Sequence, residues 1–234
     1  MELTNKSDIN FVIKTAKAAS KLIMEYYNNS LDLDIESKGD NSPVTIADKK
    51  SSDLIVKQLY NLNSRIPVIS EENPEKENLD IIKKHKTYWL IDPIDGTWSF
   101  IKKAGNFTVN IGLVKNGVPI WGLIISPIED DAVYFVDHKG VACKEVKGHI
   151  KKIHPSKPAI KGFDFLVSNR DLNQNAQDFI SNFAINTITP IKSSIKMAYM
   201  AEGIGHIYPR FKQTCIWDTA AGHALLKSVG GEVY

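Results

Sequence analysis

The sequence has little cysteine, little net charge and no long hydrophobic run. Cys143 and Cys215 are the only cysteines among 234 residues, too few for a disulfide framework or a cysteine metal site. The formal net charge of +2 does not mark the chain as a nucleic-acid or membrane binder. No apolar run approaches the roughly 20 residues of a membrane span, and the N-terminus lacks a secretory pattern. We therefore expect a cytoplasmic protein with no nucleic-acid partner and no integral membrane segment.

What the chain does contain is typical of a globular protein. Hydrophobic residues make up 43% and charged residues 24% of the sequence, which is an ordinary composition for a packed domain. The length suits one large domain or two tightly joined lobes. We expect a single domain over residues 1–234, within which residues 1–158 and 159–234 form two lobes.

Helix and strand patterns alternate in blocks along the chain. Apolar residues spaced by three and four predict helices over residues 8–28 and 46–61. Short apolar runs at 66–70 and 88–91 predict strands, and acids follow each run at once. Further expected elements are a turn over 37–45, hairpins of 107–114 with 118–126 and 132–137 with 141–146, a basic connector over 144–161, strands at 163–168 and around 206–208, and helices near 172–183, 193–202 and 218–229. This order indicates an α+β fold rather than regular βαβ units.

The segment Trp89–Thr97 combines a buried-looking strand with two aspartates. The strand delivers Asp92 to its carboxyl end, and Pro93 then blocks continuation of the sheet ladder. Asp95 follows three residues later, so a tight turn can aim both carboxylates at one point. Gly96 removes side-chain obstruction, and a helix opening at Thr97 would leave backbone N–H groups for a phosphate. Hard oxygen ligands of this kind favour Mg²⁺ over thiophilic metals.

Each acidic segment also has an ordinary structural explanation. Asp95 or Thr97 can cap a helix, Glu71-Glu72 can be solvated acids at a strand end, and Asp218 can cap the last helix. Taken singly, these explanations are favoured. Carboxylates gathered from three distant segments would repel one another unless a cation lay between them. Their combination therefore predicts a metal site.

The motifs Trp89–Thr97 and Trp217–Gly222, as a spaced pair, resemble the lithium-sensitive, Mg²⁺-dependent phosphatase superfamily. This superfamily includes inositol monophosphatases and 3′(2′),5′-bisphosphate nucleotidases, and the segment Asp40–Asp48 is similar to its metal-site loop. The resemblance runs from about residue 8 to the end of the chain. It implies a layered α-β-α-β-α sandwich of the sugar-phosphatase kind, with a metal-site lobe over 1–158 and a substrate lobe over 159–234.

The resemblance also implies a mechanism and a set of site residues. Water attacks phosphorus directly, without a phosphoenzyme, at a cluster of two or three Mg²⁺ ions. Lithium is expected to inhibit the reaction. Thr97, oriented by Asp48, positions the attacking water. The metal ligands implied are Glu71, Asp92, the Ile94 carbonyl, Asp95 and Asp218, and the substrate-binding residues are Gly96, Thr97, Ser193, Ser194, Lys196, Arg210 and Asp218.

Within the superfamily, the segment Ser193–Phe211 is most similar to the bacterial bisphosphate nucleotidases. Inositol phosphatases usually carry a small uncharged residue where Lys196 stands, and a cation there suits a second phosphate. Alternatively, Lys196 is a solvated helix residue whose stem covers apolar surface. The leading expectation is hydrolysis of 3′-phosphoadenosine 5′-phosphate to AMP and phosphate, a step of sulfur metabolism, with a nucleotide bisphosphate as substrate.

Three departures from the nucleotidases leave alternatives open. Trp98-Ser99 replaces Lys-Glu, Asn169-Arg170-Asp171 replaces Arg-Ser-His, and the sequence ends at Tyr234 where relatives continue. One alternative function is that of an inositol or sugar monophosphatase with the same chemistry. The other is that of a truncated, catalytically weak metal-binding protein with an interaction role. A face exposed beside the central sheet would also allow a homodimer.

Overall fold

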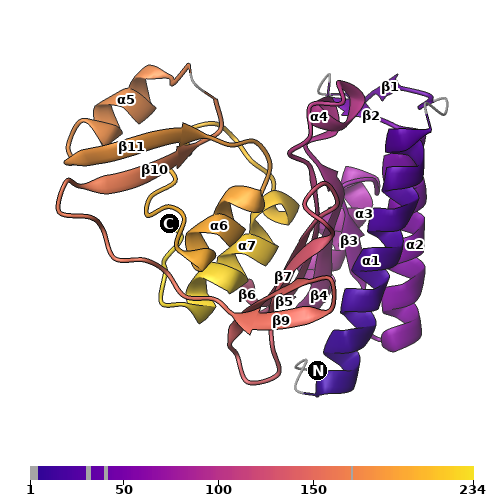
Figure 1. Ribbon diagram of the computed structural model, residues 1–234. Coiled ribbons are helices and arrows are strands. Elements are labelled where there is room, and N and C mark those ends of the chain that lie inside the picture. The colour runs from indigo at the N-terminus through magenta and orange to yellow at the C-terminus, as the bar shows by residue number, and fades with distance from the viewer. Residues whose placement is uncertain (1–4, 30–32, 40–41, 170) are drawn as a thin grey trace.

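The computed structural model describes residues 5–29, 33–39, 42–169 and 171–234, and these form five layers (Figure 1). The layers follow one another as helices, a large sheet, helices, a small sheet and a last helix. In that order they are α1 (Lys6–Asn28) with α2 (Ile46–Leu62), the sheet β3–β9, α6 (Ile195–Glu202) with α7 (Ile216–Ser228), the pair β10 (Phe163–Val167) and β11 (Ile185–Pro190), and α5 (Gln174–Ile180). This confirms the expected α-β-α-β-α sandwich.

The two helices of the outer layer are each fixed at their N-terminus by a side chain. Asn5 accepts a hydrogen bond from the Asp8 N–H at the start of α1. Thr45 and Asp48 cap α2 reciprocally, which satisfies backbone donors that have no partner within the helix. The predicted helices over 8–28 and 46–61 are confirmed. Their apolar sides pack on the large sheet and include Ile9, Val12, Ile55 and Leu59, all buried.

The large sheet has seven strands in sequence order. They are β3 (Val68–Ser70), β4 (Thr87–Asp95), β5 (Thr108–Lys115), β6 (Val118–Ser126), β7 (Ala132–Val136), β8 (Ala142–Val146) and β9 (His149–Lys152). Only β3 and β4 pair in parallel, and both predicted hairpins are confirmed. The β4–β5 ladder is irregular between Asp92 and Asp95, where Pro93 removes a donor.

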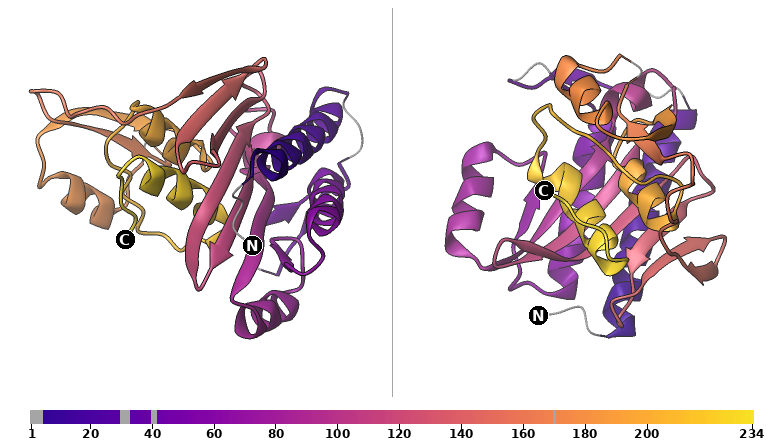
Figure 2. Two further views of the ribbon diagram at one scale, coloured as in Figure 1. Left: turned by 90° about the horizontal axis from the view of Figure 1, so that it is seen from below. Right: turned by 90° about the vertical axis from the view of Figure 1, so that its left-hand side faces the viewer.

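The inner helices cover the face of the sheet opposite α1 and α2, as both views of Figure 2 show. Helix α7 lies so close to β6 that a Cβ added to Gly122 would meet the Ala221 carbonyl oxygen at 2.2 Å. Gly222 similarly faces Met197 of α6. Small residues thus set the depth at which α7 lies, and with it the place of Asp218 in its first turn.

The small sheet has a core of its own. Strands β10 and β11 pair in parallel, and Phe165, Val167 and Ile180 bury their side chains between this sheet and α5. The predicted helix near 172–183 is present as the shorter α5, and the strand expected around 206–208 is reduced to an isolated bridge between Phe165 and Ile207.

Several elements escape the sequence patterns. Helix α3 (Glu75–Lys84) was not expected, nor were β9, β11 and the short pair β1 (Glu36–Ser37) and β2 (Pro43–Val44). The helix expected to open at Thr97 is present as α4 (Thr97–Ile101). All residues of β9 and β11 are exposed, so neither strand shows the apolar alternation that reveals a half-buried strand. The expected basic connector over 144–161 is therefore wrong for its first part. No helix of the described ranges is long and apolar enough to cross a membrane.

Candidate metal and phosphate site

Three carboxylates from distant segments meet at the carboxyl ends of β3 and β4. Glu71 follows β3, Asp92 lies in β4, and Asp218 lies in the first turn of α7. One carboxylate oxygen of each lies within 4.8 Å of the others. The parallel β3–β4 register and the hydrogen bond from Glu71 N to the Ile91 carbonyl, 3.2 Å, bring the first two together. Three hard oxygen donors at this separation fit a cation such as Mg²⁺.

The electrostatics of the cluster also fit a cation. Burial, and then repulsion from Glu71, Asp95 and Asp218, raises the pKa of Asp92 well above its ordinary value. Burial and the neighbouring Asp218 raise the pKa of Asp95 to about 6. Without a positive charge between them, these groups resist ionisation together. A divalent cation would relieve that repulsion.

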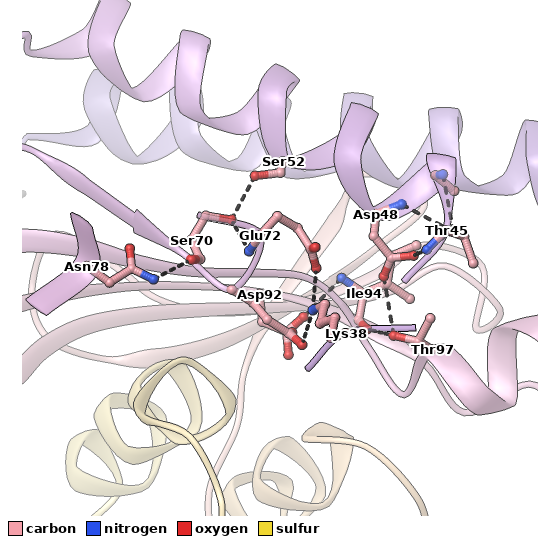
Figure 3. A network of polar contacts seen from close by, with 12 residues as sticks. Lys38, Thr45, Asp48, Ser52, Ser70, Glu72, Asn78, Asp92, Ile94 and Thr97 are labelled. Carbon is pink, nitrogen blue, oxygen red and sulfur yellow. Dashed lines mark hydrogen bonds and ion pairs between the residues drawn. The ribbon is translucent and has the colours of Figure 1, made fainter. Parts of the chain in front are cut away.

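Lys38 supplies part of the positive charge, and the sequence patterns did not single it out. Its ammonium nitrogen lies 2.7 Å from Glu71 Oε1. It also lies 2.9 Å from Glu72 Oε1 (Figure 3). Burial acts to lower the pKa of Lys38, but the two glutamates raise it overall. Lys38 lies in the segment over 37–45 that the sequence predicts as a turn. Glu72 is thus engaged by Lys38 and lies outside the carboxylate cluster.

Asp95 ties the acidic turn to the start of α6. Its carboxylate accepts a hydrogen bond from the backbone N–H of Ser194. The Ser194 hydroxyl lies 2.6 Å from Asn110 Oδ1 and 2.7 Å from the Thr108 hydroxyl on β5. Ser194 is buried, so this contact holds the end of β4 and the start of α6 in one fixed relation.

Thr97 and Asp48 lie beside the acids, joined by a hydrogen bond. The Thr97 hydroxyl is 3.1 Å from the Ile94 carbonyl oxygen and 3.3 Å from Asp48 Oδ1 (Figure 3). The other oxygen of Asp48 accepts from the Thr45 N–H, 2.8 Å, which fixes the carboxylate. Gly96 has a φ of 98° and is the N-cap of α4, a backbone state that favours glycine. The structure thus brings Thr97, Asp48 and Ile94 together, while their catalytic and ligand roles stay predictions.

A cleft of about 740 Å³ opens beside two of these acids, Asp95 and Asp218. Among the predicted substrate-binding residues, Ser193, Ser194, Lys196, Arg210 and Asp218 line it, together with Asp95. Gly96 and Thr97 are not among its lining residues, so the phosphate-binding role of their N–H groups stays a prediction.

Lys196 is buried within this cleft wall. Its ammonium group donates to the Ser193 carbonyl and lies 4.9 Å from the centre of the Tyr208 ring. Burial lowers its pKa to about 8, with Asp95 opposing and Arg210 reinforcing that shift. The alternative reading of Lys196 as a solvated helix residue is therefore wrong.

A second polar network joins α2, the end of β3 and α3 beside the acids. The Asn78 amide of α3 donates to the Ser70 carbonyl at 2.8 Å, and the Ser70 hydroxyl lies 2.7 Å from that of Ser52 on α2 (Figure 3). All three side chains are buried. The Glu72 N–H also bonds the Ser70 hydroxyl, at 3.2 Å. The network thereby fixes the residue that immediately precedes Glu71.

Parts of the predicted site lie outside the described residues. Asp40 and Asn41 of the predicted metal-site loop are among these. So is Arg170, in the segment that differs from the nucleotidase pattern. Trp98, the other departure, is 56% exposed and lies under the Lys102 ammonium at 5.2 Å.

Comparison with known proteins identifies the family of the whole chain. The model of the inositol monophosphatase family matches residues 4–234. The 3′(2′),5′-bisphosphate nucleotidase CysQ of Escherichia coli strain K12 is 37% identical over 225 residues, which cover 95% of this chain and 88% of that protein. The crystal structure of CysQ from Bacteroides thetaiotaomicron superposes with a TM-score of 0.81 at 33% identity, covering 98% and 89% of the two chains.

A more distant structure shares the fold alone. The inositol monophosphatase from Anabaena (Nostoc) sp. PCC 7120 superposes with a TM-score of 0.72 at 21% identity, covering 94% of this chain and 80% of that one. The family match over nearly the whole sequence, the conserved layering and the cluster of acids agree with one another. The chain belongs to the inositol monophosphatase family of phosphatases.

Proposed function

We propose that this protein is a Mg²⁺-dependent 3′(2′),5′-bisphosphate nucleotidase that converts 3′-phosphoadenosine 5′-phosphate to AMP and phosphate. The observation that carries the proposal is the buried Lys196, which lines one cleft together with Asp95 and Arg210. A substrate with one phosphate at the acids and a second phosphate near two cations matches this arrangement. The relatives named as bisphosphate nucleotidases support it.

The metal ligands in this proposal are Glu71, Asp92, the Ile94 carbonyl, Asp95 and Asp218, holding two or three Mg²⁺ ions. Bound Mg²⁺ would supply Lewis acidity, acidify a water and neutralise the phosphate charge. Carboxylate and carbonyl oxygens suit this ion. Li⁺ is expected to inhibit by competing at the same oxygens.

The catalytic pair is Thr97 with Asp48. The Thr97 hydroxyl bonds the Ile94 carbonyl and Asp48, so its lone pairs have a fixed direction and can hold an attacking water by accepting from it. The cap at Thr45 keeps Asp48 in place. The backbone N–H groups of Gly96 and Thr97 would receive the reacting phosphate.

The second phosphate would bind on the α6 side of the cleft. Lys196 and Arg210 supply its positive charge, and Ser193 and Ser194 supply short polar groups at the start of α6. The Arg210 guanidinium donates to the Ser168 hydroxyl at 3.2 Å and the Gln213 carbonyl at 3.3 Å. These two contacts orient its planar fork for an incoming anion.

An inositol or sugar monophosphate is the second candidate substrate. It is favoured by Trp98 and Asn169, where this chain departs from the nucleotidase pattern, since Asn169 lines the cleft. Such a substrate carries no second phosphate and leaves Lys196 without an anionic partner from the ligand.

A homodimer stays a further prediction. Sedimentation analysis would test it.

A substrate panel with one charge variant separates the candidates. Phosphate release is measured from 3′-phosphoadenosine 5′-phosphate, inositol 1-phosphate and fructose 1,6-bisphosphate, with Mg²⁺ and with chelator. The proposal predicts preference for the nucleotide and a Lys196→Met variant whose KM for it rises at least tenfold. Lys196→Arg, which keeps the charge, is the matched control and should lose less. A preference for inositol phosphate would overturn the substrate, and no turnover at all would favour a catalytically weak interaction protein.

A further inference from the structure

Two aromatic rings stand exposed at the wall of the substrate cleft. Phe179 on α5 is 36% exposed and Phe211, in the loop before α7, is 47% exposed. Their centroids lie 5.8 Å apart with an interplanar angle of 60°, and both residues line the cleft. Exposed apolar surface gathered in a cleft is a common mark of a ligand site.

The small core behind the pair holds it in place. Phe179 also contacts Phe183, with centroids 5.1 Å apart, and Phe183 in turn packs against Phe163 and Phe165. The aromatic chain thus begins inside the β10–β11 layer and ends at the cleft. A ring anchored in this way loses little further freedom when a ligand stacks on it.

The cleft wall combines three kinds of side chain. Asp95, Lys196 and Arg210 line it together with Phe179 and Phe211. Arg210 is followed directly by Phe211, which contacts Phe179. The aromatic pair therefore lies in the same cleft as a carboxylate and two cations.

We propose that Phe179 and Phe211 bind the purine base of the substrate by stacking against it. This inference rests on the proposed function, since a nucleotide bisphosphate presents two phosphates to the charged groups of the cleft and a planar base to its aromatic rings. Bases stack on aromatic side chains in a sequence-tolerant way, and a neighbouring arginine adds cation–π attraction. An inositol ring has no π-face and would gain less from the pair than a planar base.

The test compares a nucleotide with the same molecule lacking its base. Phe211→Leu and Phe179→Leu keep apolar bulk but remove the ring, while Phe211→Tyr keeps the ring. Tyr60→Leu is the control, because Tyr60 is an exposed aromatic residue of α2 that does not line the cleft. KM and kcat are measured on 3′-phosphoadenosine 5′-phosphate and on 1-deoxyribose 3,5-bisphosphate.

The inference predicts that each Leu variant raises KM for the nucleotide about tenfold, with kcat nearly unchanged and the base-free substrate unaffected. Phe211→Tyr should keep the wild-type KM, and Tyr60→Leu should leave it unchanged. Equal losses on both substrates would assign the pair to folding and overturn the inference. So would unaltered kinetics, or variants whose oligomeric state changes.

Binding of AMP and ribose 5-phosphate, measured by calorimetry with Mg²⁺ present, separates this inference from the proposed function. If the wild type hydrolyses no bisphosphate but binds AMP at least tenfold more tightly than ribose 5-phosphate, and Phe211→Leu abolishes the difference, base stacking stands and the assigned reaction fails. If AMP and ribose 5-phosphate bind the wild type equally, base stacking fails whatever the enzyme hydrolyses.

Discussion

Two carboxylates of the site also hold the first turn of a helix. Asp218 accepts from the Cys215 N–H at 3.0 Å and the Thr214 hydroxyl at 2.7 Å, while facing Glu71 and Asp92. Asp48 likewise caps α2 and reaches Thr97. A capping role and a role in the site are therefore compatible for these two residues. Capping fixes the direction of a carboxylate that a metal or a hydroxyl then uses.

The dual role of Asp218 predicts different results for two substitutions. Asp218→Asn keeps an acceptor for the helix cap and removes one repelling charge, so the metal-free protein should be at least as stable as wild type. Asp218→Ala also loses the cap, at a cost of about 1 kcal/mol. Both should lose more than 99% of Mg²⁺-dependent phosphate release. Thermal unfolding in chelator and a phosphate assay measure the two effects, and equal stability of the two variants would refute the capping argument.

Thr97 offers a test that leaves packing almost unchanged. Thr97→Val removes the hydroxyl that bonds Ile94 and Asp48, and kcat should fall about 10²- to 10³-fold, as for other lost transition-state contacts. KM should change little. Thr97→Ser retains a hydroxyl and should stay within tenfold of wild type. If Thr97→Val turns over at the wild-type rate, Thr97 does not position the water.

The raised pKa values predict how stability depends on pH when no metal is bound. The folded pKa of Asp95, about 6, exceeds its ordinary value of 3.8, and the pKa of Asp92 is raised as well. Stability from the protonated forms is complete below the unfolded pKa and is lost as pH rises through the folded pKa. In chelator, the unfolding midpoint should therefore fall by a few degrees between roughly pH 5 and 7.5.

Asp95→Asn is the control for that titration. It removes one of the titrating groups, so its midpoint should fall less over the same pH range. Saturating Mg²⁺ should raise the wild-type midpoint most at the higher pH, where the acids are ionised. If the unfolding midpoints of the wild type and of Asp95→Asn change equally with pH in chelator, the mutual repulsion of these carboxylates is contradicted.

At the scale of elements, the site depends on helix α3, which the sequence patterns did not reveal. The proline at its start reads equally well as part of a turn, and Asn78 is its one buried residue. By contrast, β4 and α7 were predictable because their apolar residues and turn-forming ends are local signals. The network of Asn78 with Ser70 joins segments eight residues apart, and no spacing rule specifies that contact.

Asn78 should therefore affect metal binding from a distance. Asn78→Leu removes one donor from the Ser70 carbonyl, which still accepts from the Asn73 N–H at 3.1 Å. The loss of one hydrogen bond costs about 1 kcal/mol and loosens the residue before Glu71. We expect the Mg²⁺ concentration for half-maximal activity to rise several-fold, while KM for substrate at saturating Mg²⁺ stays unchanged. Glu77→Gln, at an exposed position of the same helix, is the control. Unchanged Mg²⁺ dependence of Asn78→Leu would mean that α3 does not position the acids.

At the scale of the whole molecule, the site lies where the layers meet. Glu71 and Asp92 come from the large sheet, Asp218 from α7 and Lys196 from α6, and the aromatic pair belongs to α5 and the loop before α7. The family motifs predicted the acids because each motif is contiguous. The pairing of Lys38 with Glu71 and the Phe179–Phe211 contact arise only when layers pack, so the sequence did not predict them. The division into lobes at residue 158 stays a prediction.

The most direct test of the account is phosphate release from 3′-phosphoadenosine 5′-phosphate as Mg²⁺ is titrated into metal-free protein, with Asp95→Asn beside wild type. We predict no release without metal, saturable activation of the wild type, and at least a hundredfold lower rate for a folded Asp95→Asn at every Mg²⁺ concentration. Release that is independent of metal, or that survives in Asp95→Asn at the wild-type rate, would contradict the assignment of these buried acids as the metal centre of a phosphatase.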